Sequence, residues 1–274
     1  MLLSQVKDEQ LKQVTGIIVN TALPEKIFLL GVSYINRYEE TIFSAQRRQP
    51  MVEYVLQYQL LILTKPDSKT NLDELQDMIE SRCNHNATPV SIYRESIEVF
   101  NSWLQAGHPF ACHVYNNGCL VYDAGVTPLS EPGSLLTVDV MQEFAHWDNH
   151  VSEFLVGADV FRLRKQYPLA AFFLHQAAEQ ALTIFVKMST GYRVVTHNLD
   201  KLLRYARPFC IELDELFNRK KEPGLFKLLQ QAYISSRYKG DYNIKEKEVD
   251  ILMGKVKRLQ EIIRKAVKGV NRFN

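Results

Sequence analysis

The sequence predicts two parts of different fold class: a small mixed-sheet α/β domain, then an antiparallel helical bundle. Up to position 125, short apolar runs alternate with helical segments, which is typical of an α/β fold. After position 139, apolar side chains recur every three or four residues, which is typical of amphipathic helices. The length of 274 residues also favours two domains, since one domain usually takes roughly 150 residues.

A segment rich in proline and turn formers separates the two parts. It reads AGVTPLSEPGSLLTV after Asp123 and shows no sustained periodicity. We therefore assign residues 1–125 to the α/β domain, 126–138 to a linker and 139–274 to the helical domain.

The α/β half is expected to hold four strands and three helices. A strand over 26–33 leads into a glycine turn at Gly31, and Asn71 opens a helix as its cap. The other expected strands are 55–65, 88–93 and 119–123, and the expected helices are 3–21, 71–83 and 96–105.

The second half is expected to form about five helices. Its first helix carries an apolar stripe made of Phe144, Trp147, Val151, Phe154, Ala158 and Phe161. The next begins near Pro168 and ends at Gly191, and a short helix capped by Thr196 follows. The last two are expected over 225–238 and 249–266.

Composition is that of an ordinary globular protein, with 46% hydrophobic and 23% charged residues. The uncharged apolar stretches are far shorter than the roughly 18 residues that a membrane span needs. The amino-terminal segment becomes charged before any signal-like apolar region develops, so we expect a cytoplasmic protein without membrane contact. The four cysteines show no paired spacing and are expected to be buried small side chains.

Charge is distributed unevenly between the halves. Residues 1–139 carry 10 Lys and Arg against 16 Asp and Glu, whereas residues 140–274 carry 23 against 15. A basic half attracts phosphates, but this excess is too small to identify a nucleic-acid-binding protein by itself.

The first half, over roughly residues 16–125, resembles the minimal nucleotidyltransferase domain of the polymerase-beta-like superfamily. The resemblance implies that a Gly-Ser turn grips a triphosphate and that two carboxylates at i and i+2 hold Mg²⁺. Here the turn reads LLGVSYIN, with Gly31 and Ser33, and the strand reads LQYQLLIL, with Gln57 and Gln59 at the metal positions. Amide oxygens are poorer Mg²⁺ ligands than carboxylates. We therefore predict a degenerate domain, with polar residues on the wet face of a strand as the simplest alternative.

The second half resembles the HEPN family of helical domains, which often accompany minimal nucleotidyltransferases. Three strings carry the resemblance: AAFFLHQAAEQAL, GYRVVTHNLDKLL and LFKLLQQAYISSRYKGDY. It implies a homodimer and a role as a nucleotide binder, or as a ribonuclease of a toxin-antitoxin-like system.

Ribonucleases of this family use an arginine followed by a histidine. The matching arginine is Arg237, but positions 242–244 hold Tyr, Asn and Ile in place of the histidine. The resemblance therefore implies an anion site at Arg237, Tyr238, Lys239 and Asp241 that lacks this acid/base group. The alternative is that these residues are only the basic end of a helix.

Three further residues are candidates in the helical half. His175 and Glu179 share a helix face at i and i+4, and the resemblance places them near Arg237; the alternative is a structural hydrogen bond between helices. His197 is interpreted as part of a helix start. Glu143, His146 and His150 also share a face, but no second ligand group lies nearby in sequence, so we predict no metal site.

These observations predict a non-catalytic, nucleotide- or nucleic-acid-phosphate-binding regulatory protein, a pseudoenzyme that forms a homodimer through its helical domain. A nucleotide, with or without Mg²⁺, is the one cofactor suggested. The alternatives are a ribonuclease with an unusual acid/base group, an active nucleotidyltransferase and an interaction scaffold without a small ligand.

Overall fold

The computed structural model describes residues 9–37, 52–65, 72–86, 89–136, 139–210, 212–217, 222–238 and 242–269. The chain divides into two compact units, Met1–Leu136 and Thr137–Asn274. The first unit is mixed α/β and the second is helical, which confirms the predicted fold class at this level.

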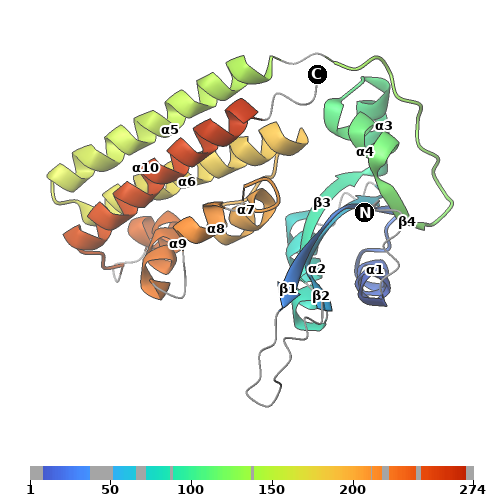
Figure 1. The fold of residues 1–274 in the computed structure, drawn as a ribbon, viewed down its shortest axis with the longest axis horizontal. Helices are drawn as coiled ribbons and strands as arrows, with labels where there is room; N and C mark the ends of the chain where they lie inside the picture. The colour runs from blue at the N-terminus through green and yellow to red at the C-terminus, as the bar shows by residue number, and fades with distance from the viewer. Residues whose placement is uncertain are drawn as a thin grey trace, which may run out of the picture. The chain divides into compact units, whose positions relative to one another are not determined.

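The first unit contains a four-stranded mixed sheet with the order β3-β2-β1-β4 (Figure 1). β1 (Lys26–Arg37) pairs antiparallel with both β2 (Val52–Thr64) and β4 (Cys119–Asp123), while β2 and β3 (Val90–Ser96) are parallel. The parallel pair is connected through helix α2 (Leu72–Asn86), as a crossover requires.

Helices α1 (Glu9–Ala22) and α2 pack on one face of this sheet. Their buried side chains, which include Val14, Ile18 and Ile79, form one hydrophobic core with the alternate strand residues Leu60 and Ile62. On the other face, Tyr93 of β3 contacts Phe110 of α4, with ring centroids 6.0 Å apart. That face is covered by α3 (Ile97–Gln105), which Ser96 caps through the backbone N–H of Val99, and by α4 (Pro109–Asn117).

The sequence analysis made no prediction for α4, although Pro109 in its first turn is a recognised helix-start signal. One sequence-based prediction in this unit is wrong. The predicted glycine turn does not exist, because β1 continues through Gly31 and Ser33 to Arg37. Both residues pair with β2 inside the strand, with a register irregularity between Leu29 and Gly31.

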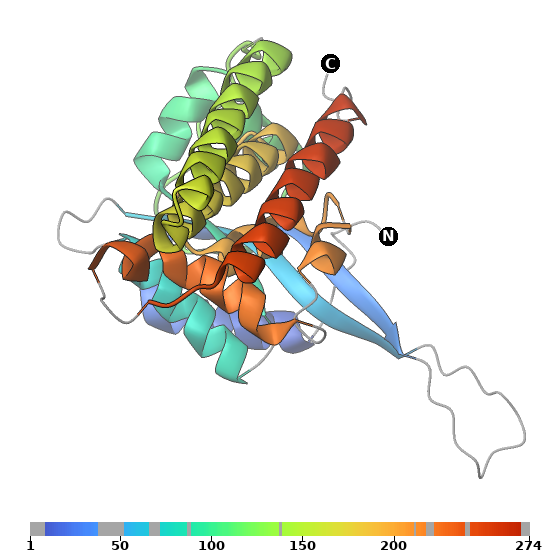
Figure 2. The ribbon, with the colours of Figure 1, turned by 90° about the vertical axis from the view of Figure 1, so that its left-hand side faces the viewer.

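The second unit contains six helices in the described residues, against about five predicted. They are α5 (Val140–Leu163), α6 (Tyr167–Thr190), α7 (Leu199–Ala206), α8 (Glu212–Leu216), α9 (Pro223–Tyr238) and α10 (Glu246–Gly269). Figure 2 shows α5, α6 and α10 lying side by side along their length.

The ends of α6 follow the predicted signals. Pro168 lies in the first turn, and Gly191 ends the helix in the left-handed conformation at φ 77°, donating its N–H to the carbonyl of Lys187. The cap of α7 is a correction: Asn198 accepts from the Lys201 N–H, whereas Thr196 accepts from the N–H of Asn198 itself.

α6 is the central helix of the bundle. Among the described residues it is the one helix with the length and hydropathy to cross a membrane, with a mean hydropathy of 1.3 over its most apolar stretch. Because 67% of that stretch is buried within the protein, its apolar character is that of a core helix. Five of its buried residues are alanines, at positions 170, 171, 177, 178 and 181, and these small side chains allow neighbouring helices to approach closely.

Candidate functional site

The predicted metal positions of the first unit are buried and neutral. Gln57 is 1% exposed and Gln59 7% exposed, so the interpretation of a wet strand face is wrong. The side-chain amide of Gln57 donates to the hydroxyl of Ser91 over 2.5 Å. The side chain of Gln59 lies against Gly31, where an added Cβ would meet its amide carbon at 3.4 Å.

The neighbouring strand adds a residue that the sequence analysis did not single out. Ser91 on β3 is the register partner of Gln59 and is fully buried. In the predicted Mg²⁺ site, a third carboxylate would come from a strand next to β2, at the position opposite Gln59. Gln57, Gln59 and Ser91 are therefore three buried, neutral residues on neighbouring strands, with no carboxylate among them.

In the second unit, His175 and Glu179 are brought together inside the bundle. They lie one turn apart on α6, with His175 fully buried and Glu179 8% exposed. The Nδ1 atom of His175 is 3.6 Å from Oε2 of Glu179 and 3.4 Å from the side-chain nitrogen of Gln176. The predicted pairing of these two residues on one helix face is confirmed.

His197 completes this cluster, although the sequence suggested only a helix start. Its Nδ1 lies 3.1 and 3.0 Å from the two carboxylate oxygens of Glu179. Its ring stacks on Tyr233 of α9, with centroids 4.0 Å apart and an interplanar angle of 17°. The side chain of His197 is nevertheless 54% exposed, so a solvent-accessible imidazole lies within hydrogen-bond distance of a buried carboxylate.

The backbone of His197 is held from two helices. Its carbonyl oxygen lies 3.1 Å from Nε2 of His175 and accepts from the side-chain amide of Gln230 at 3.2 Å. The side-chain oxygen Oε1 of Gln230 in turn accepts from the backbone N–H of Leu199 at 2.7 Å. We refer to His175, Glu179, His197, Gln230 and Tyr233 as the His197 cluster.

Sequence reasoning missed Gln230 and Tyr233 because the helical pattern of α9 gives no reason to separate them from other partly buried residues. The pairing of His197 with Glu179 was also missed, since 18 residues and a helix end separate the two. One signal was available: a histidine two residues before the first buried leucine of α7 lies where the chain must return to the bundle.

Burial controls the ionisation of Glu179. Desolvation raises the pKa of its carboxyl group, while the hydrogen bond and charge of His197 and the hydrogen bond of Gln176 act to lower it. The net direction is upward from the ordinary value of 4.5. Ionised Glu179 therefore depends on hydrogen-bond donors inside the cluster, and His197 is the principal one.

The predicted anion residues lie at the end of α9. Arg237 is four residues after Tyr233, which places its backbone one turn further along the same helix face. Tyr238 is the last residue of α9. Lys239 and Asp241 lie outside the described residues.

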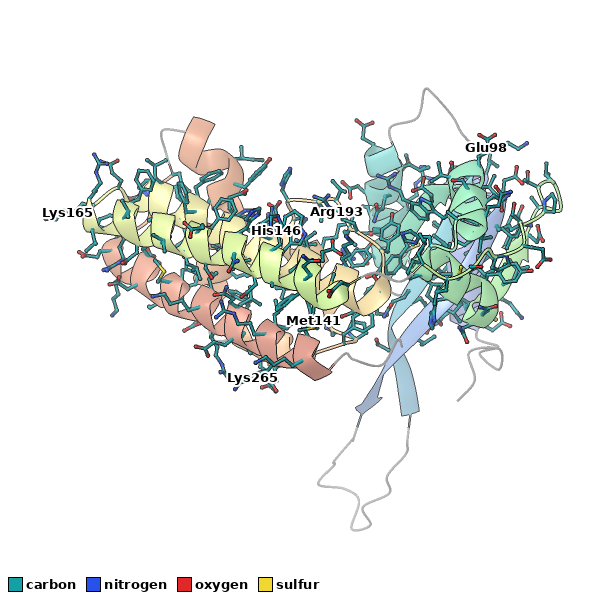
Figure 3. All side chains as sticks on the ribbon, turned by 90° about the horizontal axis from the view of Figure 1, so that it is seen from above. Glu98, Met141, His146, Lys165, Arg193 and Lys265 are labelled. Carbon is teal, nitrogen blue, oxygen red and sulfur yellow. The ribbon has the colours of Figure 1, made fainter. Side chains whose placement is uncertain are left out.

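The α5 residues considered for a metal make other contacts. Glu143 forms an ion pair with Lys187. The rings of His146 and His150 lie 4.5 Å apart, and Arg193 lies over the ring of the intervening Trp147 at 5.5 Å. Figure 3 labels His146 and Arg193. Within the described part of the chain, no group of three or more His, Cys, Asp or Glu side chains is arranged to hold a metal ion.

Comparison with known families places this site in context. Residues 148–267 match the family model of the HEPN domain, a range that begins within α5 and ends within α10 and contains the whole His197 cluster. No curated protein matches the chain. A HEPN domain indicates a nucleic-acid-related function for the second unit. The match does not reach the first unit, whose likeness to nucleotidyltransferases stays a prediction.

Proposed function

With a HEPN domain over residues 148–267 as the premise, we propose that this chain is a cytoplasmic regulatory protein that binds the phosphates of RNA or of a nucleotide. The binding surface comprises the exposed edge of the His197 cluster and the carboxyl-terminal turn of α9, where Arg237 lies. The first unit, a degenerate nucleotidyltransferase-like domain in this proposal, contributes no nucleotidyl transfer.

One observation carries the proposal: an exposed imidazole stacks on Tyr233 of α9, and an arginine position follows Tyr233 one turn later on the same helix. The ring of His197 stacks on Tyr233, and position 237 is one turn beyond it. Guanidinium and imidazole groups both donate hydrogen bonds to phosphate oxygens. The imidazole ring of His197 itself suits a nucleobase, because bases of single-stranded nucleic acids stack on aromatic and histidine rings.

Substitution of Arg237 tests the binding site directly. Arg237→Ala is expected to weaken binding of single-stranded RNA by about tenfold or more, since a charge-assisted contact to phosphate contributes about 1.5–3 kcal/mol. Arg237→Lys should recover part of the affinity, because lysine keeps the charge but lacks the planar fork. Fluorescence anisotropy with a labelled RNA at fixed salt concentration measures both.

Arg258→Ala is the matched control, because Arg258 lies on the exposed face of α10 and pairs with Glu261 at 3.0 Å. It should bind RNA as the unaltered protein does. Equal affinities of the Arg237→Ala and Arg258→Ala proteins would place the site elsewhere, and a lowered melting temperature of Arg237→Ala alone would make Arg237 a structural residue.

We further propose that two copies associate through α5. Val156, Val160 and Leu163 are 57%, 46% and 67% exposed and lie on successive turns of this helix, whose ends are marked by Met141 and Lys165 in Figure 3. Antiparallel pairing about a two-fold axis would place Val156 against Val160 of the second copy. The same pairing brings Glu153 near Arg164, so the charges are complementary at both ends of the stripe.

The double substitution Val156→Glu and Val160→Glu is expected to convert a dimer into a monomer, because four carboxylates would meet at the centre of the interface. Light scattering coupled to gel filtration measures the change. Leu120→Glu, a substitution of an exposed apolar residue in the first unit, should leave the dimer intact. If the unaltered protein is a monomer at tens of micromolar, the proposed association of two copies through α5 is wrong.

A further inference from the structure

Two exposed histidines on the first helix of the bundle have ring nitrogens that the protein does not use. His146 and His150 lie one turn apart on α5. Within the part of the chain that the structure describes, the two rings contact each other and the ring of Trp147, and no hydrogen bond or ion pair engages their nitrogens. Both imidazoles are therefore available to a ligand from outside the protein.

The separation of the two rings is that of a metal chelate. Their centroids lie 4.5 Å apart and their planes are inclined by 58°. A histidine nitrogen bound to Zn²⁺ lies about 2.0–2.1 Å from the ion, so the centroid of its ring lies about 3 Å from the ion. Two imidazoles on one tetrahedral ion consequently have centroids about 5 Å apart. Small rotations of the His146 and His150 side chains bring the rings to this separation.

Trp147 restricts the movement of both rings. Its ring is edge-on to both histidines, with centroids 6.0 Å from that of His146 and 5.6 Å from that of His150. The guanidinium group of Arg193 in turn lies over the Trp147 ring at 5.5 Å. A side chain that packing already restricts loses less conformational entropy when it binds a ligand. The two histidines are thus partly pre-organised.

The protein supplies two ligands at this place and no third. Glu143, one turn before His146, forms an ion pair with Lys187, which engages its carboxylate. Among the described residues, no group of three or more His, Cys, Asp or Glu side chains is arranged around one point. Arg193 adds a positive charge near the pair, which weakens the binding of a cation. Water or another external ligand has to complete the coordination of an ion held here.

The geometry points to a metal site that is separate from the His197 cluster: His146 and His150 together chelate one divalent transition-metal ion on the surface of α5. Imidazole nitrogen suits Zn²⁺, Ni²⁺ and Cu²⁺, whereas Mg²⁺ and Ca²⁺ take oxygen ligands. The ion is therefore of a different class from the Mg²⁺ that accompanies a nucleotide. Its binding does not depend on the proposed binding of RNA.

This site differs from the sequence-based expectation that this face of α5 holds no metal. That expectation rested on the lack of a further ligand group nearby in sequence. Spacing at i and i+4 places two histidines on one face, but it does not show whether their rings lie together or whether other residues engage their nitrogens. The ring contacts supply both answers.

The test is a calorimetric titration of the full chain, without a histidine tag, with Zn²⁺ or Ni²⁺ alone. One ion per chain is expected to bind. His146→Ala and His150→Ala should each weaken this binding at least about tenfold, because one imidazole cannot form a chelate. Both variants should keep α5 intact, since alanine is the most favourable residue in a helix. His113→Ala, which removes an exposed histidine of α4, is the matched control and should bind the ion normally.

The fluorescence of Trp147 reports where the ion binds. The chain has two tryptophans, so Trp103→Phe leaves Trp147 as the one indole. Ni²⁺ quenches fluorophores that lie close to it, and the Trp147 ring contacts both histidines. Addition of Ni²⁺ to the Trp103→Phe protein should therefore quench the emission, and a chelator should restore it. The quenching should disappear when His150→Ala is added to this variant.

Three outcomes would overturn the inference. The first is an unchanged affinity for Zn²⁺ and Ni²⁺ in both His146→Ala and His150→Ala. The second is a stoichiometry of one ion per two chains, which would require ligands from two copies. The third is loss of binding in His197→Ala but not in His146→Ala, which would place the ion at the His197 cluster.

Discussion

Purified protein supplied with Mg²⁺ or Mn²⁺ and a nucleoside triphosphate is expected to transfer no nucleotide to protein, RNA or a small acceptor. The reason is the neutral group on the sheet. Metal ions that bridge substrate phosphates need carboxylates, and the positions predicted to correspond to them carry Gln57 and Gln59, with the neutral Ser91 opposite Gln59 on β3. Incorporation of a radiolabelled nucleotide measures the activity.

The geometry of β1 strengthens this prediction. A turn that grips a triphosphate presents several backbone N–H groups to the phosphates. Gly31 and Ser33 are instead paired with Gln59 and Gln57 inside the β1–β2 ladder, so their backbone belongs to a strand. Within the described residues of β1 and β2, carboxylates are therefore missing from the two predicted metal positions, and the backbone at Gly31 forms no phosphate-binding turn.

The double variant Gln57→Ala and Gln59→Ala serves as the control. Nucleotide transfer by the unaltered protein that disappears in this variant would show that the glutamines are active-site residues and that the comparison of strands is wrong. Transfer retained in the variant would point to carboxylates elsewhere. The expected result is background incorporation for both proteins.

Gly157→Val is expected to cause the largest loss of stability among simple substitutions in the helical unit. A Cβ at position 157 of α5 would lie 2.6 Å from Cδ1 of Phe173 on α6, which is closer than real contacts allow. The ring of Phe173 cannot move freely, since it packs near Phe154, Phe161 and Phe172. Overpacking of this kind costs about 1–3 kcal/mol, and the branched side chain of valine should lie at the upper end.

Gly254→Ala is the matched control in the same unit, with an effect of opposite sign. Gly254 lies within α10, and an added Cβ there meets no atom within 4 Å. Alanine in a helix interior is more favourable than glycine by up to about 1 kcal/mol, so the melting temperature should rise. Calorimetry measures both variants. Equal melting temperatures would show that α5 and α6 do not approach as closely at Gly157 as the structure indicates.

Local signals determined most of the helices and strands. The stop at Gly191 and the apolar stripes of α5 and α10 depend on residues within a turn or two of each other, so the sequence alone predicts them. Strand β4 was predicted with its observed bounds for the same reason. Helix α4 was not predicted, although Pro109 supplies a start signal in its first turn.

The pairing of β1 with β2 determines that the backbone at Gly31 is part of a strand and not a turn. A glycine after an apolar run is ordinarily a turn signal, but β2 continues opposite it and the side chain of Gln59 occupies the space beside it. The burial of Gln57 and Gln59 has the same origin, because alternation assigns residues to a face of a strand without showing which face is covered. Ser91 joined them only through the parallel register of β2 and β3.

By itself, the sequence determined that the chain has an α/β part and a helical part, that Gln57 and Gln59 stand two residues apart on one strand, and that His175 and Glu179 share a helix face. Only the tertiary structure decided that Glu179 serves His197 and that Tyr233 and Gln230 hold the histidine in place. These contacts join α6, α9 and the segment between α6 and α7. Spacing along one helix predicts neighbours one turn apart, but it contains no information on which side chains of other helices the packing brings to the same point.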